Sequence, residues 1–440
     1  SCAWRGWEPL RSLTGALDMA EIPPEPSLFF TVPDGLPLSP GLPPGARVEL
    51  FPEPHLALHV PGAHVFWSDW ALNAADGDTG VPDAAAVLHE PEDGGRVAWF
   101  GFRGRQAVGE RDARRVSRLL HNGILWAAGA VTAEVAKWPG GHRAALLVAE
   151  DVETGFANSA ALARLLRERG ARGTFFPVSE MALAHPELGD SLVAAGEVGS
   201  QTADHVSTAG LPETEQAVRL GRSVRDLEAW TGQPVTGLRP PEERFDAATI
   251  RAWRRAGGTW FAALNEARSA APEIFPTPDG PVVLLPRLLK DDYNVFVQEG
   301  ARRTDRLRDA WLEGVRKMEA LGGFAYLSLH SQIAGSPDRV GVVGEVLDSV
   351  AARPAGWWVA TGREIAGWWM ERDAARLSLA RVADTLVLRV APAPRPGTET
   401  WVELYLPRDA SLRPHEGNRP LPWAPTEWGI RFPLPAGGDA

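Results

Sequence analysis

The spacing of apolar and polar positions divides the chain into three regions. In the first region, short apolar runs such as residues 96–102 predict strands, and residues 110–130 have the periodicity of an amphipathic helix. In the second, continuous apolar strands alternate with amphipathic helices, and in the third, period-two strands alternate with Pro and Gly turns. We therefore predict an α/β domain, a (β/α) barrel of parallel strands, and a small β-sandwich, over residues 1–138, 139–371 and 372–440.

The end of the first region faintly resembles the tail of a glutamine-amidotransferase-like domain. The resemblance rests on the strand "GRVAWFGFRG" at residues 95–104 and on the helix that follows it. Amidotransferases of this kind need a nucleophilic cysteine, and the single cysteine of the chain is Cys2. We therefore expect a non-catalytic domain.

Composition and charge exclude several classes of protein. The chain has 440 residues, of which 44% are hydrophobic and 23% are charged, as is typical of globular domains. Its formal net charge of −11 argues against nucleic acid as the main partner, because phosphate binding needs clustered Lys and Arg. No run of 18 apolar residues occurs, so we expect no transmembrane segment.

The sequence begins Ser-Cys-Ala, and a cysteine at this position is where a bacterial lipoprotein carries its lipid after signal cleavage. A chance position of the chain start explains Cys2 equally well. The lipoprotein interpretation predicts a lipid anchor at Cys2 and an extracytoplasmic location, in the cell envelope or secreted.

Tryptophan is unusually frequent, with 18 Trp against three Tyr. Trp401, Trp423 and Trp428 fall in the predicted β-sandwich and could form a platform that stacks on sugar rings. A packed core between two sheets accounts for them as well, and we favour the core because aromatic side chains mainly bury area.

Polar residues follow the strands of the central region at four places. These places are Glu150-Asp151, residues 201–205, residues 239–241 and His330. A single Asp at a strand end is usually a turn or cap residue, and a single His is usually structural. Four such groups at the carboxyl ends of parallel strands nevertheless predict a common site, because those ends gather at one edge of the fold.

The motifs of the central region resemble those of the polysaccharide deacetylases, carbohydrate esterase family 4. The similarity lies in "RAALLVAED", "GTFFPV", "HPELGDSLVAAGEVGSQTADH", "TGLRPPEE" and "AYLSLHS", in this order along the chain. The resemblance implies a distorted, partly open (β/α) barrel. It also implies removal of acetyl groups from a glycan with a divalent metal, most often zinc, held by an Asp and two His.

Residue by residue, the first two motifs imply a catalytic base and a metal site. Glu150 stands at the position of the base, and Asp151 at that of a metal ligand. The two histidine positions hold Gln201 and His205, so one imidazole ligand is replaced by an amide. An amide oxygen is a weak zinc ligand, and Asp204 could supply a carboxylate in its place.

The remaining motifs imply groups that assist catalysis. Arg239 matches the arginine that orients the base, and Glu242 offers the first backbone N–H after two prolines for an oxyanion. His330 matches the general acid, with Asp291 or Asp292 as the candidate acidic partner.

Three functions remain open at this stage. The chain is an active, metal-dependent deacetylase with a modified site, an inactive relative that binds glycan or serves as a scaffold, or a metal-free hydrolase that uses Glu150 and His330. Gln201 is the residue that puts activity in question.

Overall fold

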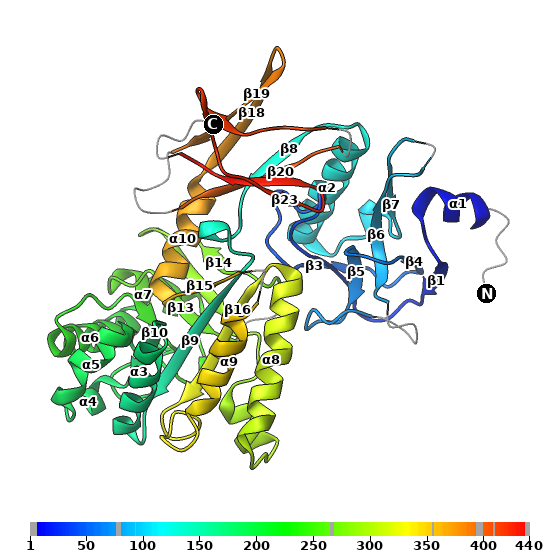
Figure 1. Cartoon of the computed structure of the whole chain (residues 1–440). Coiled ribbons are helices and arrows are strands. Elements are labelled where there is room, and N and C mark those ends of the chain that lie inside the picture. The colour runs from blue at the N-terminus through cyan, green and yellow to red at the C-terminus, as the bar shows by residue number, and fades with distance from the viewer. Residues whose placement is uncertain are drawn as a thin grey trace.

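The structure is a computed structural model that describes residues 7–75, 81–92, 94–264, 268–353, 356–392, 399–407 and 410–435. Cys2 and the predicted lipid anchor lie outside this range. In Figure 1 the N-terminal part lies beside the central part, and the C-terminal strands lie next to both. Within the described residues, no helix combines the length and the apolar character that crossing a bilayer requires.

The N-terminal part is a seven-stranded sheet with two helices. Its elements are α1 (Trp7–Thr14), β1 (Asp18–Ile22), β2 (Leu28–Val32), β3 (Ala46–Leu50), β4 (His55–His59), β5 (Val65–Ser68), β6 (Asp83–His89), β7 (Val97–Phe100) and α2 (Gly109–Ala127). The strand order is β1-β4-β6-β5-β2-β3, with β7 also paired to β6. Phe30, Trp67 and Phe102 of the sheet region share a core with Val116 and Leu119 of α2.

The strand and the helix that suggested an amidotransferase-like domain are present as β7 and α2. The strand pairs of their sheet are antiparallel. The region is thus a mixture of helix and strand, as predicted, although it lacks the alternation of helices with parallel strands found in the central part. The amidotransferase-like resemblance itself stays a prediction.

The central part alternates strands and helices, as the sequence predicts. Its elements are β9 (Ala144–Val152), α3 (Ser159–Glu168), β10 (Gly173–Pro177), α4 (Ser179–Ala182), α5 (Gly189–Ala195), β11 (Gly196–Val198), α6 (Glu213–Thr231), β12 (Gly237–Leu238), α7 (Ala247–Arg255), β13 (Trp260–Ala263), β14 (Glu273–Phe275), β15 (Val282–Pro286), α8 (Thr304–Leu321), β16 (Phe324–His330), α9 (Gly341–Ala351), β17 (Trp357–Val359) and α10 (Gly362–Ala374).

These strands form two sheets instead of one closed barrel. One sheet has the order β11-β10-β9-β16, with β17 also on β9, and the other has the order β12-β13-β15-β14. A single parallel bridge between Ser200 and Leu238 joins them. Among the described residues no strand pair joins β16 to the second sheet. The α/β class is therefore confirmed, whereas closure into a barrel is not.

β9 lies between two hydrophobic cores and positions the candidate site. Leu146 and Val148 belong to the core that includes α8 and α9, whereas Leu147 and Ala149 belong to the core that contains Trp260. Successive side chains of a strand point to opposite faces. The two carboxylates at the end of β9, Glu150 and Asp151, therefore point in opposite directions.

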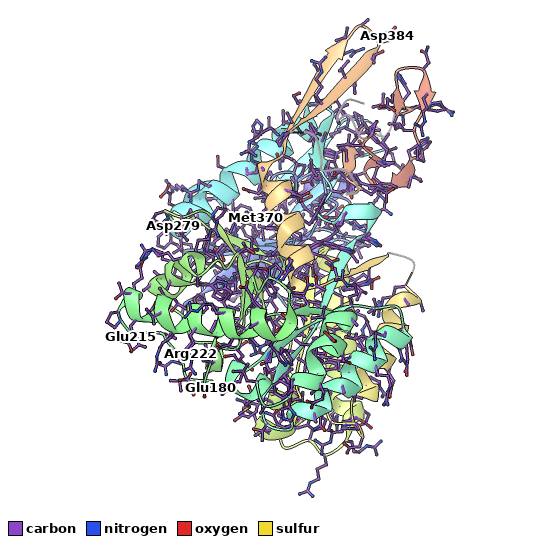
Figure 2. The ribbon with its side chains drawn as sticks, turned by 90° about the vertical axis from the view of Figure 1, so that its left-hand side faces the viewer. Glu180, Glu215, Arg222, Asp279, Met370 and Asp384 are labelled. Atoms are coloured by element: carbon purple, nitrogen blue, oxygen red, sulfur yellow. The ribbon has the colours of Figure 1, made fainter. Side chains whose placement is uncertain are left out.

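The C-terminal part is made of short antiparallel strands. Its elements are β8 (Thr132–Val135), β18 (Arg376–Val382), β19 (Thr385–Ala391), β20 (Trp401–Tyr405), β21 (His415–Glu416), β22 (Arg419–Pro420), β23 (Ala424–Thr426) and β24 (Gly429–Pro433). β23, β24, β20 and β8 form one sheet, and β18 and β19 form a hairpin. Figure 2 shows this hairpin projecting from the molecule, with Asp384 at its tip.

β8 precedes the central part in sequence but pairs with β20 from the end of the chain. The sheet β23-β24-β20-β8 thus includes a strand from the region assigned to residues 1–138, and a β-sandwich over residues 372–440 stays a prediction. Trp428 packs edge-on against Trp126 of α2, whereas Trp423 is exposed. The packing of Trp428 agrees with a core role better than with a sugar platform.

Candidate metal site

The ends of β9 and β16 bring Asp151 and His330 together. The two strands are parallel neighbours, and His330 is paired with Asp151 in their register. His330 Nε2 lies 3.7 Å from Asp151 Oδ2. Arg239, which follows β12, donates from Nε to both oxygens of Asp151 at 3.1 and 3.3 Å. Burial raises the pKa of Asp151, and the positive charges of Arg239 and His330 oppose this rise.

Glu153 is a central residue of the site that the sequence analysis missed. It accepts hydrogen bonds from Gln201 Nε2 at 2.7 Å and from Gln332 Nε2 at 3.0 Å. His205 Nε2 lies 3.0 Å from the same carboxylate. Burial alone would raise the pKa of Glu153. The hydrogen bond to His205 and the charges of His205 and His330 outweigh this effect and lower the pKa to about 2. The site therefore contains a permanently charged carboxylate beside Asp151.

The loop that carries Gln201 and His205 is held in an unusual backbone conformation. Thr202 and His205 have φ angles of 67° and 60°, in the left-handed region that non-glycine residues rarely adopt. The loop is fixed to its neighbours, since Gln201 N–H donates to the carbonyl of Pro177 and Ser179 N–H donates to that of Thr202. Such a conformation persists only where the surrounding contacts hold it, as is common at functional sites.

Gln201 was predicted as a metal ligand, but the structure gives it another contact. Its amide nitrogen donates to Glu153 and lies 3.2 Å from His205 Nε2. Its amide oxygen, Oε1, is a buried acceptor without a hydrogen-bond partner in the described part of the chain. The hydrogen bond and charge of Glu153 raise the pKa of His205, and burial acts against this rise. In the structure Gln201 therefore orients Glu153 through its amide nitrogen, and its role as a metal ligand stays a prediction.

His330 has the acidic partner that the sequence analysis sought, and that partner is Asp292. His330 Nδ1 lies 2.7 Å from Asp292 Oδ1, and the backbone N–H of His330 donates to Asp292 Oδ2 at 2.9 Å. Burial alone would lower the pKa of His330, but the hydrogen bond to Asp292 and the charge of Asp151 raise it to about 9. Asp291 instead accepts a hydrogen bond from the N–H of Asn294 and lies 3.5 Å from Arg287.

Glu150 does not lie where its predicted role as catalytic base requires. It is completely buried, and neither carboxylate oxygen has a hydrogen-bond partner among the described residues. A Cβ added at Gly335 would lie 2.0 Å from Glu150 Oε1, so the carboxylate is pressed against the loop after β16. Burial, with the charges of Asp292 and Asp151, raises its pKa well above the usual value. A fully buried carboxyl group with a raised pKa, on the face of β9 opposite Asp151, is poorly placed to take a proton from water.

Of the two glutamates after Pro240 and Pro241, the second points into the site. The side chain of Glu242 is exposed and lies 3.6 Å from Arg244, and the role predicted for its backbone N–H stays a prediction. Glu243 instead accepts hydrogen bonds from Arg239 and from Arg287, the latter at 2.6 and 2.7 Å. Burial would raise the pKa of Glu243, but Arg239 and Arg287 lower it to about 2. Glu243 therefore anchors the arginine that holds Asp151.

Asp204, the predicted substitute ligand, faces solvent. It is exposed and accepts a hydrogen bond from the backbone N–H of Val206 in a local turn. The carboxylate that reaches Gln201 and His205 is that of Glu153.

Asp151, Glu153 and His330 form a group that fits a divalent metal. Each offers a ligand atom, and these atoms lie within 4.8 Å of one another. Imidazole nitrogens and carboxylate oxygens are both zinc ligands, and catalytic zinc sites bind three protein ligands and a water. Of the predicted metal ligands, Asp151 belongs to this group. His205 lies beside the group through its contact with Glu153.

Comparison with known proteins supports the resemblance found in the motifs. Residues 140–260 match the family model described as polysaccharide deacetylase. This segment contains Asp151, Glu153, Gln201 and His205. A search of curated proteins gave no match. The central part of the chain is thus related to the polysaccharide deacetylases, a family of metal-dependent hydrolases.

Among solved structures, one described as a polysaccharide deacetylase from Mycobacterium smegmatis is similar at 24% sequence identity and a TM-score of 0.49, covering 57% of this chain and 98% of that one. PuuE allantoinase is similar at 19% identity and a TM-score of 0.47, over 53% of this chain and 92% of that one. A carbohydrate esterase family 4 pseudoenzyme from Bacillus anthracis, BA3943, is similar at 16% identity and a TM-score of 0.37, over 50% of this chain and 65% of that one.

Proposed function

We propose that the chain is a metal-dependent hydrolase of the deacetylase type that acts on an acetylated glycan. The observation that carries the proposal is the convergence of Asp151, Glu153 and His330. Zinc is the metal we expect, because carboxylate and imidazole donors suit it. A bound metal at such a site activates water and polarises a carbonyl oxygen.

The surrounding residues have distinct tasks in this proposal. Arg239 fixes the orientation of Asp151, and Asp292 fixes the imidazole of His330 through Nδ1, so that Nε2 faces Asp151. Gln201 and Gln332 hold the two oxygens of Glu153. Contacts of this kind orient metal ligands and tune their basicity. His205 lies 3.0 Å from Glu153, whose hydrogen bond and charge raise the pKa of the imidazole, and it is then the group placed to donate a proton.

The test is metal retention by the purified chain, followed by acetate release from acetylated chitooligosaccharides and acetylated xylan. We expect close to one zinc per chain and acetate release that chelation abolishes. Glu153→Gln should bind zinc at least about tenfold more weakly, because a charged ligand becomes a neutral one. Asp204→Asn, which removes an exposed carboxylate one residue before His205, is the matched control and should retain zinc. Equal zinc affinity of the two variants would contradict the role of Glu153.

A second candidate is a binding module without catalysis, and one feature favours it. Every member of the ligand group already has a protein partner of opposite charge or a hydrogen bond, since Asp151 binds Arg239, Glu153 binds His205, and His330 binds Asp292. The site is therefore electrostatically balanced without a metal. This function predicts affinity for a glycan that is unchanged by chelator, and loss of that affinity on adding chelator would rule it out.

We further propose an extracytoplasmic location for the protein. Support comes from the glycan substrates of the related family. Fractionation of cells that express the chain measures this, and recovery of the protein in the cytoplasmic fraction would contradict it.

A further inference from the structure

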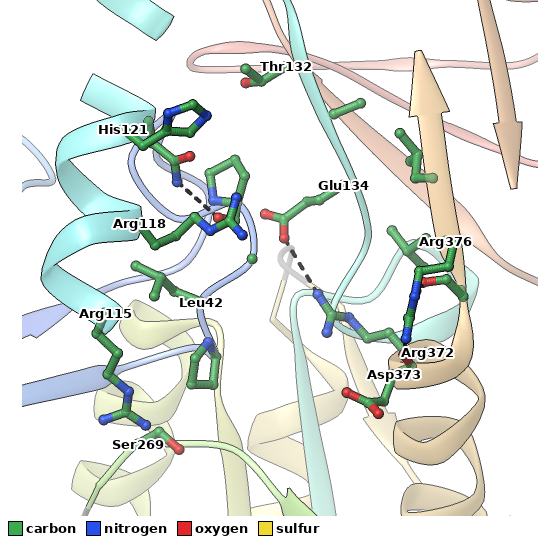
Figure 3. A pocket seen from close by; sticks show the side chains of 18 of the residues that line it. Leu42, Arg115, Arg118, His121, Thr132, Glu134, Ser269, Arg372, Asp373 and Arg376 are labelled. Atoms are coloured by element: carbon green, nitrogen blue, oxygen red, sulfur yellow. Dashed lines mark hydrogen bonds and ion pairs between the residues drawn. The ribbon is translucent and has the colours of Figure 1, made fainter. Parts of the chain in front are cut away.

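A second site is formed where the three parts of the chain meet. A cavity of about 820 Å³ lies between the loop at residues 40–43, helix α2, strand β8, the segment at residues 269–274 that leads into β14, and the junction of α10 with β18 (Figure 3). Its volume is in the range of small-molecule sites, typically about 300–1,000 Å³. The lining includes no residue of β9 and none of the three residues Asp151, Glu153 and His330. The cavity therefore belongs to neither the metal site nor the proposed glycan reaction.

Basic side chains predominate in the lining of this cavity, although the chain as a whole has a net charge of −11. Arg115, Arg118, Arg372 and Arg376 line it, together with His121. The carboxylates of the lining are Glu134, Glu273 and Asp373. Glu134 pairs with the buried Lys137 and, at 3.5 Å, with Arg372 across the cavity, and it accepts a hydrogen bond from the hydroxyl of Tyr405 at 3.0 Å. The lining thus holds four guanidinium groups against three carboxylates, one of which is also neutralised by Lys137.

Arg118 is the residue that most clearly lacks a counter-ion. In the part of the chain that the structure describes, its guanidinium makes no hydrogen bond and no ion pair. Figure 3 shows Arg118 and Glu134 pointing into the cavity from opposite walls. The side chain of Arg118 packs on the backbone of Gly41, where an added Cβ would lie 3.4 Å from its Nε. Arg118 is thus placed by packing and not by an acidic partner.

The surroundings of Arg118 are fixed by hydrogen bonds from both sides of the cavity. Asn122 is buried and donates from Nδ2 to the carbonyls of Leu38 and Pro40, which holds the loop that contains Gly41 against α2. Across the cavity, the guanidinium of Arg372 lies over the ring of Trp369 and donates to the carbonyl of Ala136. Both walls are therefore organised before any ligand arrives, which lowers the entropic cost of binding.

We propose that this cavity binds a small organic anion, a molecule of sugar size that carries a phosphate or a carboxylate. Guanidinium groups bind these oxygen anions through paired hydrogen bonds, and Arg118 and Arg376 reach the cavity from α2 and β18. Apolar residues such as Leu42, Leu125 and Leu377 line the remaining walls and suit the body of the ligand. Because N-terminal, central and C-terminal residues all contribute, the ligand holds the three parts together.

The experiment is calorimetric titration of the full chain at low ionic strength with glucose 6-phosphate, glucuronate and glucose. We expect binding of at least one of the two anionic sugars and none of glucose. Binding of glucose 6-phosphate alone identifies a phosphate as the recognised group, and binding of glucuronate alone identifies a carboxylate. Binding of neither anion, or equal binding of glucose, overturns the proposal.

Variants on the same helix separate a built site from general charge attraction. Arg118→Gln should weaken binding by about tenfold or more, because a charge-assisted hydrogen-bond pair is lost. Arg114→Gln removes the same charge from an exposed position of α2 that does not line the cavity, and it should leave affinity unchanged. Arg376→Gln tests the opposite wall independently. Equal losses in Arg118→Gln and Arg114→Gln overturn the proposal, and circular dichroism verifies that each variant is folded.

Discussion

The carboxylate of Asp292 determines the charge of His330. It is completely buried and contacts both the ring Nδ1 and the backbone N–H of that residue. The pKa of His330 is raised to about 9, so the contribution of its positive charge to stability is fully present below pH ~6.5. This contribution is lost as the pH rises through about 9.

We predict that Asp292→Asn lowers the pKa of His330 by more than about one unit, because the first and strongest favourable contact of the imidazolium is removed. Titration of the imidazole by NMR in metal-free protein measures this change. His55 of β4, whose pKa is lowered by burial and which neither Asp292 nor His330 affects, provides the internal control in the same spectra. An unchanged titration of His330 in the variant would show that Asp292 does not control its charge.

At the scale of single residues, the sequence predicts those site residues that end strands. Asp151, Arg239 and His330 follow apolar strands directly, and the carboxyl ends of parallel strands converge. The sequence does not predict Glu153 as a site residue, because Glu153 lies one residue beyond the end of β9, where the alternation of side chains along a strand no longer applies. Which of Glu242 and Glu243 points its side chain into the site depends on the backbone, because both residues have positive φ angles, of 55° and 56°. The residue types do not reveal these angles.

At the scale of elements, one buried carboxylate joins four of them. Glu197 of β11 accepts hydrogen bonds from Trp260 of β13, from Thr174 of β10 and from Arg363 near the start of α10. Burial raises its pKa to about 7, and the contacts with Arg363 act against this rise. Between about pH 4.5 and 7, the folded chain therefore holds a proton that the unfolded chain has released, so stability falls as the pH rises.

We predict that Glu197→Gln gains stability relative to the wild type as the pH rises from 5 to 8, by up to about 3 kcal/mol, because the amide cannot ionise. Urea unfolding of both proteins at the two pH values measures the difference. Glu180→Gln, at an exposed ion pair with Arg222, should show no such trend. If the difference in the free energy of unfolding between Glu197→Gln and the wild type is the same at both pH values, the pKa of Glu197 is not raised in the folded protein.

Elements with clear apolar periodicity could be predicted, whereas their partners in the sheets could not. The strand and helix order of the central part follows from the alternation that Figure 1 shows as ribbons around β9. Closure of the central sheets into a barrel depends on hydrogen bonds between strands that are far apart in sequence. Only the single bridge from Ser200 to Leu238 joins the two sheets among the described residues, so the barrel is not closed. The pairing of β8 with β20 spans more than half of the chain, so local pattern assigns β8 to the wrong part.

At the scale of the whole molecule, a buried cluster of charges joins the three parts. Lys137 follows β8 and pairs with Glu134 and with Asp34 of the N-terminal part, the latter at 3.6 Å. Arg143, just before β9, lies 3.0 Å from Glu403 of β20. Lys137 is almost inaccessible to solvent, so its ammonium, together with Arg143 and Arg372, neutralises the neighbouring carboxylates without help from water.

We predict that Lys137→Met lowers the free energy of unfolding by about 3–5 kcal/mol, because it leaves buried carboxylates without their cation. Lys290→Met removes a lysine from an exposed pair with Glu299 and should cost less than about 1 kcal/mol. Urea unfolding followed by both circular dichroism and tryptophan fluorescence measures the two losses. Coincident transitions in the wild type that separate in Lys137→Met would show that the cluster couples the three parts. A loss no larger than that of Lys290→Met would mean instead that the parts are held together by their apolar contacts and by the β8–β20 pairing.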